Sequence, residues 1–244
     1  MKQIAFITDL HLNEPLPDGH FVEPFQHLQF VLADIEKRKI TEIVFGGDIG
    51  DASAHNDFFV ALKPFSVHLI LGNHDRYEQV QSHFAKGMDR KELYYKVEFQ
   101  QYVSLFLDSS SGSISDNQLD WLQRELRSSK RKILNVHHPV LPIDTPADKA
   151  FLLENRNELD SILRECDEAV NVFCGHYHMN DERELGNIKQ FCTPSMAFQL
   201  VKNSAEISFD SSGYGYRVIE LFEDRIDTHL VEFRSNVRVS KSLT

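Results

Sequence analysis

The stretch Gln3-Ile-Ala-Phe-Ile-Thr-Asp-Leu-His11 begins as a short apolar run and ends in an aspartate and a histidine. Four more segments repeat this order, with an apolar run of strand length followed at once by Asp, Asn or His: residues 43–51, 67–75, 133–139 and 169–178. Short apolar runs bounded by turn residues are typical of buried strands. The recurrence predicts a sheet with polar residues at the carboxyl ends of its strands.

The segments between these strands favour an α/β architecture, because several have the apolar spacing of helices. A capping box, Ser115 with Gln118 three residues later, marks the start of one helix. Short strands with Gly and Ser turns are expected after residue 187. The other expected elements are helices over residues 23–39 and 147–165 and a hairpin over residues 94–97 and 102–107.

The composition is that of an ordinary globular protein. The chain has 244 residues, 41% of them hydrophobic and 26% charged, which is enough to bury a full core without disulfides. No internal repeat, low-complexity tract or linker interrupts it, so we expect one domain over residues 1–244. No apolar run reaches the length of a membrane span, and the first residues lack a signal-peptide core. Three cysteines without CxxC spacing suit free thiols, and we expect a cytoplasmic protein with no membrane partner.

The charge balance narrows the class of ligand. With 26 Lys and Arg against 37 Asp and Glu, the formal net charge is −11. Neutralising many phosphates needs a clustered basic surface, so a long nucleic acid is not an expected partner. A small phosphorylated ligand held by a metal is compatible with this balance.

Polar side chains at the ends of the five expected strands should meet at one edge, because ligands of open α/β sheets bind outside the carboxyl ends of the strands. Alternate strand residues share a face, so Asp9 and His11 can point the same way, as can His176 and His178. Glycines at positions 47, 72 and 175 permit backbone conformations that a side chain would strain. The convergent side chains are Asp9, His11, Asp48, Asn73, His74, His137, His138, His176 and His178.

This donor set predicts a metal centre. Imidazoles and carboxylates without thiolate suit first-row transition metals such as Mn, Fe or Zn. Seven potential ligands exceed what one ion takes and match two ions that share a carboxylate. Two ions about 3.5–4 Å apart can clamp a phosphoryl group and generate a hydroxide at neutral pH. The leaving alkoxide still needs a proton, which a histidine beside the ions can donate. His74, which follows Asn73, is the candidate.

The five blocks resemble the signature of the calcineurin-like metallophosphoesterases: D-x-H at 9–11, G-D-x-x-D at 47–51, G-N-H-D at 72–75, H at 137 and G-H-x-H at 175–178. Residues 192–199 and 213–221 are similar to the tail of the bacterial cyclic-AMP phosphodiesterase branch, the Icc/CpdA type. The resemblance implies an α/β fold (α+β in some schemes), a four-layer αββα sandwich of two mixed β-sheets flanked by helices. In that fold the late strands would form the second sheet.

The resemblance also implies a role for each matched residue. One ion would be bound by Asp9, His11, Asp48 and His178. The other would be bound by Asp48 as the bridge, with Asn73, His137 and His176. His74 would neutralise the phosphate and protonate the leaving oxygen, and Asp75 would orient His74.

Some residues beside these blocks have two interpretations. His137, the first residue after its strand, is taken as the ligand, which leaves His138 for substrate or for support of a ligand. Asp51 can cap the next segment or hold a ligand histidine in its tautomer, and we favour the second. Thr193 and Ser195 can contact substrate or form a turn.

Two departures from the protein Ser/Thr phosphatases of this superfamily make a phosphoprotein substrate unexpected. Those enzymes carry an arginine after the second Asp of G-D-x-x-D, where this chain has Ala52, and a glutamate where Asp75 stands. Arg76 follows a turn, and we expect it in solvent rather than on phosphate.

The activity that the resemblance implies is that of a phosphoric ester hydrolase, a dinuclear metal phosphodiesterase with a metal-bridging hydroxide and with His74 as the acid. Its expected partner is a small phosphodiester, with 3′,5′-cyclic AMP as the leading substrate. Alternatives are 2′,3′-cyclic nucleotides, glycerophosphodiesters and phosphomonoesters. A nuclease fits the net charge poorly, and a non-catalytic scaffold fits poorly because every ligand position is filled. The tail of the family often contributes to dimers, so a homodimer is compatible with the resemblance.

Overall fold

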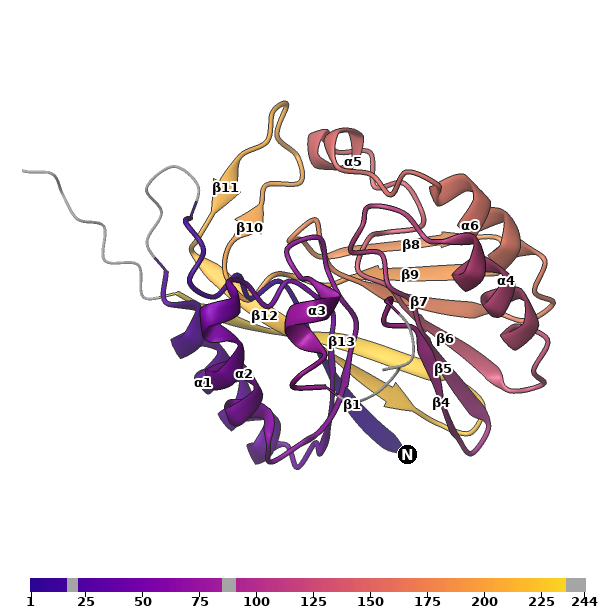
Figure 1. Cartoon of the computed structure of the whole chain (residues 1–244), viewed down its shortest axis with the longest axis horizontal. Helices are drawn as coiled ribbons and strands as arrows, with labels where there is room; N and C mark the ends of the chain where they lie inside the picture. Colours follow the sequence, from indigo (N-terminus) through magenta and orange to yellow (C-terminus); the bar gives the residue numbers. More distant parts are fainter. Residues whose placement is uncertain (17–21, 85–90, 236–244) are drawn as a thin grey trace, which may run out of the picture.

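Two large β-sheets pack against each other in the computed structural model, which describes residues 1–16, 22–84 and 91–235 (Figure 1). The first sheet has the strand order β13-β12-β1-β2-β3. Its strands β1, β2 and β3 are parallel, whereas β12 and β13 continue the sheet antiparallel on the other side of β1. The strands are β1 (Lys2–Ile7), β2 (Glu42–Phe45), β3 (Ser66–Leu69), β12 (Gly213–Leu221) and β13 (Ile226–Arg234).

The second sheet has the strand order β4-β5-β6-β7-β9-β8. Strands β5, β6, β7 and β9 are parallel, and β4 and β8 pair antiparallel at the two edges. Its strands are β4 (Tyr95–Phe99), β5 (Tyr102–Phe106), β6 (Arg131–Asn135), β7 (Val170–Cys174), β8 (Asp181–Leu185) and β9 (Ile188–Cys192). A separate pair, β10 (Gln199–Leu200) and β11 (Phe209–Asp210), is antiparallel.

Helices cover the outer face of each sheet, with α1 and α2 on the first and α4 and α6 on the second (Figure 1). Along α1, Leu28, Val31 and Ile35 recur at helical spacing and are buried against Ala5 and Ile7 of β1. The helices are α1 (Pro24–Lys37), α2 (His55–Leu62), α3 (Tyr77–Val80), α4 (Asp116–Glu125), α5 (Pro146–Ala150) and α6 (Arg156–Arg164), with a 3₁₀ turn, η2 (Ala52–Ala54).

The alternate residues of β1 face the other sheet. Ile4 and Phe6 pack into an apolar layer with Phe106 of β5 and Phe173 of β7, and the rings of Phe6 and Phe173 are 6.1 Å apart. Period-two alternation therefore places one side of β1 against helices and the other against the second sheet. The order helix, sheet, sheet, helix confirms the expected four-layer αββα sandwich of two mixed sheets.

The late strands divide between the sheets, which corrects the expectation that they form the second sheet. Strand β9 joins the second sheet between β7 and β8, but β12 and β13 extend the first. The register of β12 explains the difference, because Val218 and Ile219 pair with Ala5 and Ile4 of β1. This pairing covers the open edge of β1 with a strand that is buried on both faces.

The expected helix over residues 147–165 is two helices, α5 and α6, separated by residues 151–155. The side chain of Asn155 accepts a hydrogen bond from the N–H of Ile114 at 2.9 Å and donates one to the carbonyl of Ile114 at 2.8 Å. The N–H of Glu154 donates to the carbonyl of Gly112 at 2.9 Å. These bonds to a distant loop replace helical ones, which the apolar spacing could not indicate. The spacing did not indicate α2 either.

Ser115 caps the start of helix α4 as predicted, because its hydroxyl accepts a hydrogen bond from the N–H of Gln118 at 3.4 Å. The Gln118 side chain does not complete a capping box. It bonds instead to the backbone of Asp108, where it accepts from the N–H and donates to the carbonyl, both at 2.8 Å. Among the described residues, no helix has the length and apolar character to cross a membrane.

Candidate metal centre

The loops that follow five parallel strands bring the predicted ligands to one edge of the sandwich. These loops follow β1, β2 and β3 of the first sheet and β6 and β7 of the second. Donor atoms of Asp9, His11, Asp48 and His178 all lie within 4.8 Å of one another, and the four residues are buried. They are the set that the resemblance assigns to a single ion.

The backbone of the loops, rather than strand alternation, aims these side chains. Strand β1 ends at Ile7 and β7 at Cys174, so the paired ligands lie beyond the strands on which we expected them. Non-glycine residues adopt a left-handed φ uncommonly, at a cost on the order of 1–3 kcal/mol each, and such strain clusters at functional sites. Five predicted ligands have a φ of 45° to 68°: Asp9, His11, Asp48, His176 and His178.

The glycines beside the ligands serve two different purposes. Gly47 has a φ of +99°, as predicted from its freedom to adopt left-handed conformations. At Gly72 and Gly175 the reason is space, because a Cβ there would overlap the carboxylates of Asp48 and Asp9 respectively. Gly72 lets the loops after β2 and β3 of the first sheet approach each other closely, and Gly175 does the same for the loops after β1 and β7, which belong to different sheets.

His11 and His178 direct their Nε2 atoms to a common position. The Nδ1–H of His178 donates to the carbonyl of Phe198 at 3.0 Å, and the Nδ1–H of His11 donates to Glu14 Oε2 at 2.7 Å. The two Nε2 atoms then face each other at 3.1 Å, and that of His178 is 3.2 Å from Asp9 Oδ1. Acceptor nitrogens that converge between carboxylates, with the other ring nitrogen held, form the donor set of a transition metal.

His137, not His138, faces this centre. The Nδ1–H of His137 donates to the carbonyl of Gly46 at 2.7 Å. Its Nε2 lies 3.2 Å from Asp48 Oδ2 and is buried without a hydrogen-bond partner among the described residues. A buried nitrogen without a hydrogen-bond partner, beside the carboxylate of Asp48 that both ions are predicted to share, has the environment of a metal ligand. His138 instead pairs its Nδ1 with the hydroxyl of Ser109 at 2.8 Å.

His176 and Asn73 complete the second predicted set around the same pocket. The Nε2–H of His176 donates to the carbonyl of Phe151 at 2.8 Å, which leaves Nδ1 as the free donor atom. The ring centroid of His176 is 5.1 Å from that of His137. Burial, and then the charge of His137, lowers the pKa of His176 to about 4. The ring is therefore neutral near pH 7, which is the form that binds metals.

The electrostatics of the buried groups favour positive charge at this centre. Burial alone would raise the pKa of Asp48, but attraction to His137 outweighs it and holds that pKa well below its usual range. Burial alone would also raise the pKa of Asp9, but attraction to His178 outweighs it and lowers that pKa. Burial alone would lower the pKa of His137, but attraction to Asp48 raises it to about 10. A metal cation supplies charge of the same sign.

Asp75 supports the backbone of the centre and not the side chain of His74. Its buried carboxylate accepts three backbone hydrogen bonds, from Asp48 at 2.7 Å and from Ile49 and Gly72 at 2.9 Å. These bonds tie the loop after β2 to the loop after β3. Burial, and then the charge of Asp48, raises the pKa of Asp75 to about 7. The predicted orientation of His74 by Asp75 is wrong, because the carboxylate is engaged with these N–H groups.

Glu14 holds His74 instead, and sequence reasoning did not single it out. Its carboxylate lies between two imidazoles and accepts hydrogen bonds from the Nδ1–H of His11 at 2.7 Å and of His74 at 3.1 Å. The rings of His11 and His74 meet edge to face with centroids 4.7 Å apart. The only signal in the sequence is an acidic residue three positions after His11, and such residues are common.

This arrangement leaves His74 able to carry a proton at the edge of the pocket. The hydrogen bond to Glu14 raises the pKa of His74. Burial would raise the pKa of Glu14, but its bonds to His11 and His74 lower it to about 2, so the carboxylate stays ionised. The His74 side chain is 43% exposed, and its Nε2 is free to meet a ligand.

Asp51 caps a turn and does not hold a ligand histidine. Its carboxylate accepts the N–H of Ser53 at 2.9 Å at the start of η2, and the residue is exposed. The interpretation that we favoured for Asp51 is therefore wrong, because Glu14 already occupies Nδ1 of His11.

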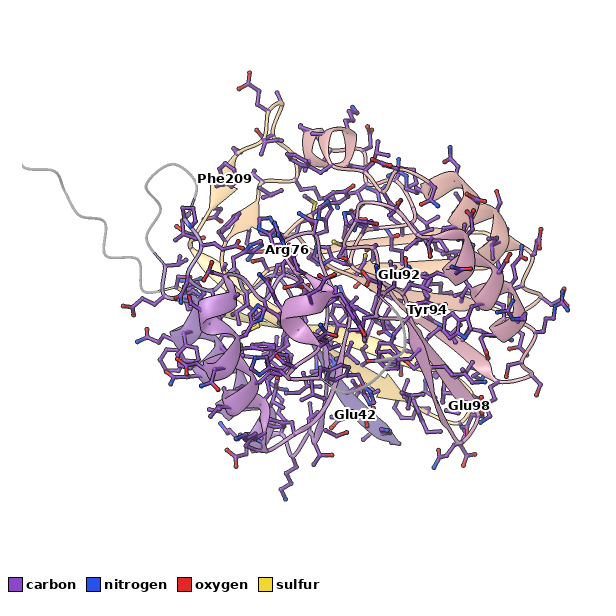
Figure 2. The ribbon with its side chains drawn as sticks, viewed as in Figure 1. Glu42, Arg76, Glu92, Tyr94, Glu98 and Phe209 are labelled. Atoms are coloured by element: carbon purple, nitrogen blue, oxygen red, sulfur yellow. The ribbon has the colours of Figure 1, made fainter. Side chains whose placement is uncertain are left out.

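The remaining candidates lie outside the pocket. Ser195 forms a turn that supports a ligand, because its hydroxyl donates to the carbonyl of Asp9 at 2.8 Å and accepts the N–H of Ala197 at 2.9 Å. Thr193 is fully buried. Arg76 is exposed and immediately precedes α3, where Figure 2 labels it.

An open pocket of about 470 Å³ leads to the centre. Its polar lining residues are His11, His176, His178, Asp48, Asn73, Glu14 and His74. Its apolar lining residues are Pro15, Phe151, Phe198, Leu200, Ile207 and Phe209. The donor set is suited to two metal ions, and His74 stands where it can donate a proton, so the arrangement can hydrolyse a phosphate ester.

Comparison with known proteins gives the same family for most of the chain. Residues 2–180 match the model of a family described as calcineurin-like phosphoesterase. A protein of Pseudoalteromonas sp. (strain SM9913), named a probable cyclic nucleotide phosphodiesterase, is 26% identical over 241 residues, with 93% of this chain and 91% of that protein covered. The 3′,5′-cyclic adenosine monophosphate phosphodiesterase of Escherichia coli (strain K12) is 27% identical over 241 residues, with 91% and 86% covered.

Solved structures agree on the architecture. A dimetal phosphatase from Danio rerio superimposes with a TM-score of 0.71 at 16% sequence identity, and the match covers 97% of this chain and 96% of that one. At this identity the likeness concerns the fold, and it agrees with the two mixed sheets and flanking helices described above.

Proposed function

This chain belongs to the calcineurin-like phosphoesterase family and is a metal-dependent phosphodiesterase, and we propose that it hydrolyses 3′,5′-cyclic nucleotides, cyclic AMP first among them. The observation that carries the proposal is the group of four buried donors, Asp9, His11, Asp48 and His178, within 4.8 Å of one another. They open to a pocket that also contains His74. The names of the relatives in Pseudoalteromonas and Escherichia coli support the choice of substrate.

The two proposed metal positions share Asp48. Its Oδ2 is 3.2 Å from His137 Nε2 and 3.6 Å from His11 Nε2, so one carboxylate faces ligands of both sets. Fe, Mn or Zn suits these ligands. Two bound ions would polarise the phosphate and lower the pKa of water. The proposed ligand sets are Asp9, His11, Asp48 and His178 for one ion, and Asp48, Asn73, His137 and His176 for the other.

His74 is the proposed acid. Ring opening of a 3′,5′-cyclic phosphate releases the 3′ oxygen of the ribose, an alkoxide that needs a proton as the P–O bond breaks. Glu14 accepts the Nδ1–H of His74 at 3.1 Å, so Nε2 carries the proton that can be delivered. General acid catalysis of this kind contributes about 10²- to 10⁴-fold in rate.

The test is a substrate panel on protein loaded with Mn²⁺. We would compare kcat/KM for 3′,5′-cyclic AMP, 2′,3′-cyclic AMP, glycerophosphocholine and p-nitrophenyl phosphate. We expect 3′,5′-cyclic AMP to have the highest value, and Asp48→Asn to lower it at least a hundredfold. Asp57→Asn, the same change at an exposed aspartate of α2, is the control and should have no effect. A higher value for another ester would refute the proposed substrate.

Three further expectations from the sequence stay predictions: a single domain, a cytoplasmic location and a homodimer. A small phosphodiester is the only partner that the proposal needs. The same variants separate an enzyme from a scaffold with the same fold. An enzyme should keep its activity in Asp57→Asn, which has every proposed ligand, and lose it in Asp48→Asn.

A further inference from the structure

Apolar side chains make up a large part of the lining of the pocket that leads to the metal centre. Phe151 follows α5, and most of the others, among them Leu200, Ile207 and Phe209, belong to the segment that forms the β10–β11 hairpin. These two segments are distant in the sequence but lie near each other at the top of the molecule in Figure 1. We call this part of the lining the apolar wall: Phe151, Phe198, Leu200, Ile207 and Phe209.

The apolar wall is attached to the metal centre through backbone hydrogen bonds. The carbonyl of Phe198 accepts the Nδ1–H of His178 at 3.0 Å, and the N–H of Leu200 donates to the carbonyl of His178 at 3.0 Å. The ring of Phe198 is 4.6 Å from the ring of His178 and 5.6 Å from that of Phe209. A continuous apolar surface therefore begins at a predicted metal ligand and extends outward along the hairpin.

Parts of the apolar wall remain exposed. Phe151 is 55% exposed and Ile207 is 37% exposed, and Phe209, which Figure 2 labels beside β11, is half-buried. Exposed apolar groups that line a pocket together mark a surface that a ligand covers. Metal ions bound at the centre would attract an anion such as a phosphate. The ligand that matches the whole pocket therefore has a phosphate at one end and a flat apolar group at the other.

We infer that the apolar wall holds the nucleobase of the substrate, and that it does so without selecting one base over another. This inference rests on the proposed function. Stacking and apolar contact tolerate every base, because each base has a π-face. Selection among bases needs hydrogen bonds to their edges. Each described polar side chain that lines the pocket, such as Glu14, Asn73 or His74, already has a role at the proposed metal centre.

The polar residue between Phe198 and Leu200 in the chain is already engaged. Gln199 of β10 accepts the N–H of Ser195 at 3.2 Å, and its amide donates to the carbonyls of Ser195 at 2.8 Å and Gly213 at 3.2 Å. It therefore has no amide donor left for a base edge. A site that hydrogen-bonds its ligand can reject an analogue by about 10⁴-fold, whereas an apolar site discriminates by at most about two orders of magnitude.

The experiment measures binding and turnover separately, on protein loaded with Mn²⁺. Isothermal titration calorimetry would give Kd for AMP, GMP, CMP and ribose 5-phosphate. Kinetics would give kcat/KM for cyclic AMP, cyclic GMP, cyclic CMP and glycerophosphocholine, which has no base. The variants are Phe209→Ala and, because Phe209 also packs on Phe198, the more exposed Ile207→Ala. The control is Val201→Ala, which removes an apolar side chain of the same hairpin that is 43% exposed and outside the pocket lining.

We expect Phe209→Ala to weaken AMP binding between about fivefold and a hundredfold, the usual loss for a stacked base, and Ile207→Ala to weaken it less. Ribose 5-phosphate binding and glycerophosphocholine hydrolysis should not change, and neither should any property of Val201→Ala. The three cyclic nucleotides should agree in kcat/KM within about a hundredfold. The loss in Phe209→Ala should appear in KM more than in kcat.

Two results would overturn the inference while the proposed function stands. One is a preference above a hundredfold for one base. The other is an equal loss of AMP and ribose 5-phosphate binding in both Phe209→Ala and Ile207→Ala. A different result would refute the proposed function instead: the protein hydrolyses glycerophosphocholine but no cyclic nucleotide. If its binding of AMP still depends on Phe209, the apolar wall would be supported as a base site.

Discussion

Replacement of Glu14 by glutamine tests whether the proton on His74 is delivered to the leaving oxygen. The carboxylate of Glu14 accepts the Nδ1–H of His74 at 3.1 Å and that of His11 at 2.7 Å. An amide of the same size keeps one acceptor oxygen but carries no charge, and its NH₂ would face one of the two imidazoles. The change therefore loosens His74 without emptying the space beside it.

The size of the effect follows from the exposure of the pair. Hydrogen bonds with a charged partner contribute about 1.5–3 kcal/mol, and neutral ones about 0.5–1.5 kcal/mol. His74 is 43% exposed and Glu14 19% exposed, so solvent screening places the difference near the lower end, at about 1 kcal/mol. That corresponds to a loss of roughly fivefold in kcat/KM for cyclic AMP.

The assay compares two leaving groups. The 3′ oxygen of cyclic AMP needs a proton as it leaves, whereas p-nitrophenolate leaves bis(p-nitrophenyl) phosphate as a stable anion. We expect Glu14→Gln to lower kcat/KM for cyclic AMP and to leave the value for bis(p-nitrophenyl) phosphate within about twofold. The metal content of each preparation, measured by mass spectrometry, shows whether His11 still binds.

Glu98→Gln is the matched control. Glu98 lies on β4, far from the pocket and paired with Lys96 and Lys130 at the surface (Figure 2), and its substitution should change neither substrate. Equal losses for both leaving groups in Glu14→Gln, at full metal content, would refute the reasoning, because loosened proton delivery cannot slow the departure of p-nitrophenolate.

Three other perturbations test the centre and the fold. Asp75→Asn should lower the free energy of unfolding by about 2 kcal/mol or more, since an amide cannot accept three backbone N–H bonds; urea unfolding measures the loss. Mn²⁺ at a hundred times its Kd should raise the free energy of unfolding by about 2.7 kcal/mol, whereas the gain should be smaller in Asp48→Asn. Burial lowers the pKa of His27 below its usual 6.5, so the unfolded chain takes up the proton first and stability should fall as the pH drops below 6.5. His27→Phe, which keeps a ring beside Tyr214, should show a smaller fall between pH 8 and pH 5.5, and an unchanged fall would contradict this assignment.

The elements that could be predicted are those whose signal is local. Strand β1 and helix α1 are each identified by the spacing of their own apolar residues, which both bury against the same core. Asp9, Asp48 and His178 come within four residues of the ends of their strands in the chain. Metal chemistry needs those residue types in any arrangement of the loops, so the sequence could indicate a metal centre without its geometry.

The features that could not be predicted depend on partners far away in the chain. The break between α5 and α6 exists because Asn155 bonds to Ile114, a residue outside the helical pattern. Asp75 appeared to support its neighbour His74, yet its carboxylate binds the backbone of the loop after β2. Glu14 carried no motif, and only the folded loop places it between two imidazoles.

The sequence by itself determined the chemical identity of this protein: the αββα architecture, the family, and the carboxylate and imidazole donors at the strand ends. Only the tertiary structure decided how those donors are aimed. Left-handed turns at Asp9 and His178, and the carbonyl of Phe198 that holds His178, direct them inward. The orientation of a side chain in a loop depends on contacts between segments that meet only after both sheets have packed, and no local pattern contains that information.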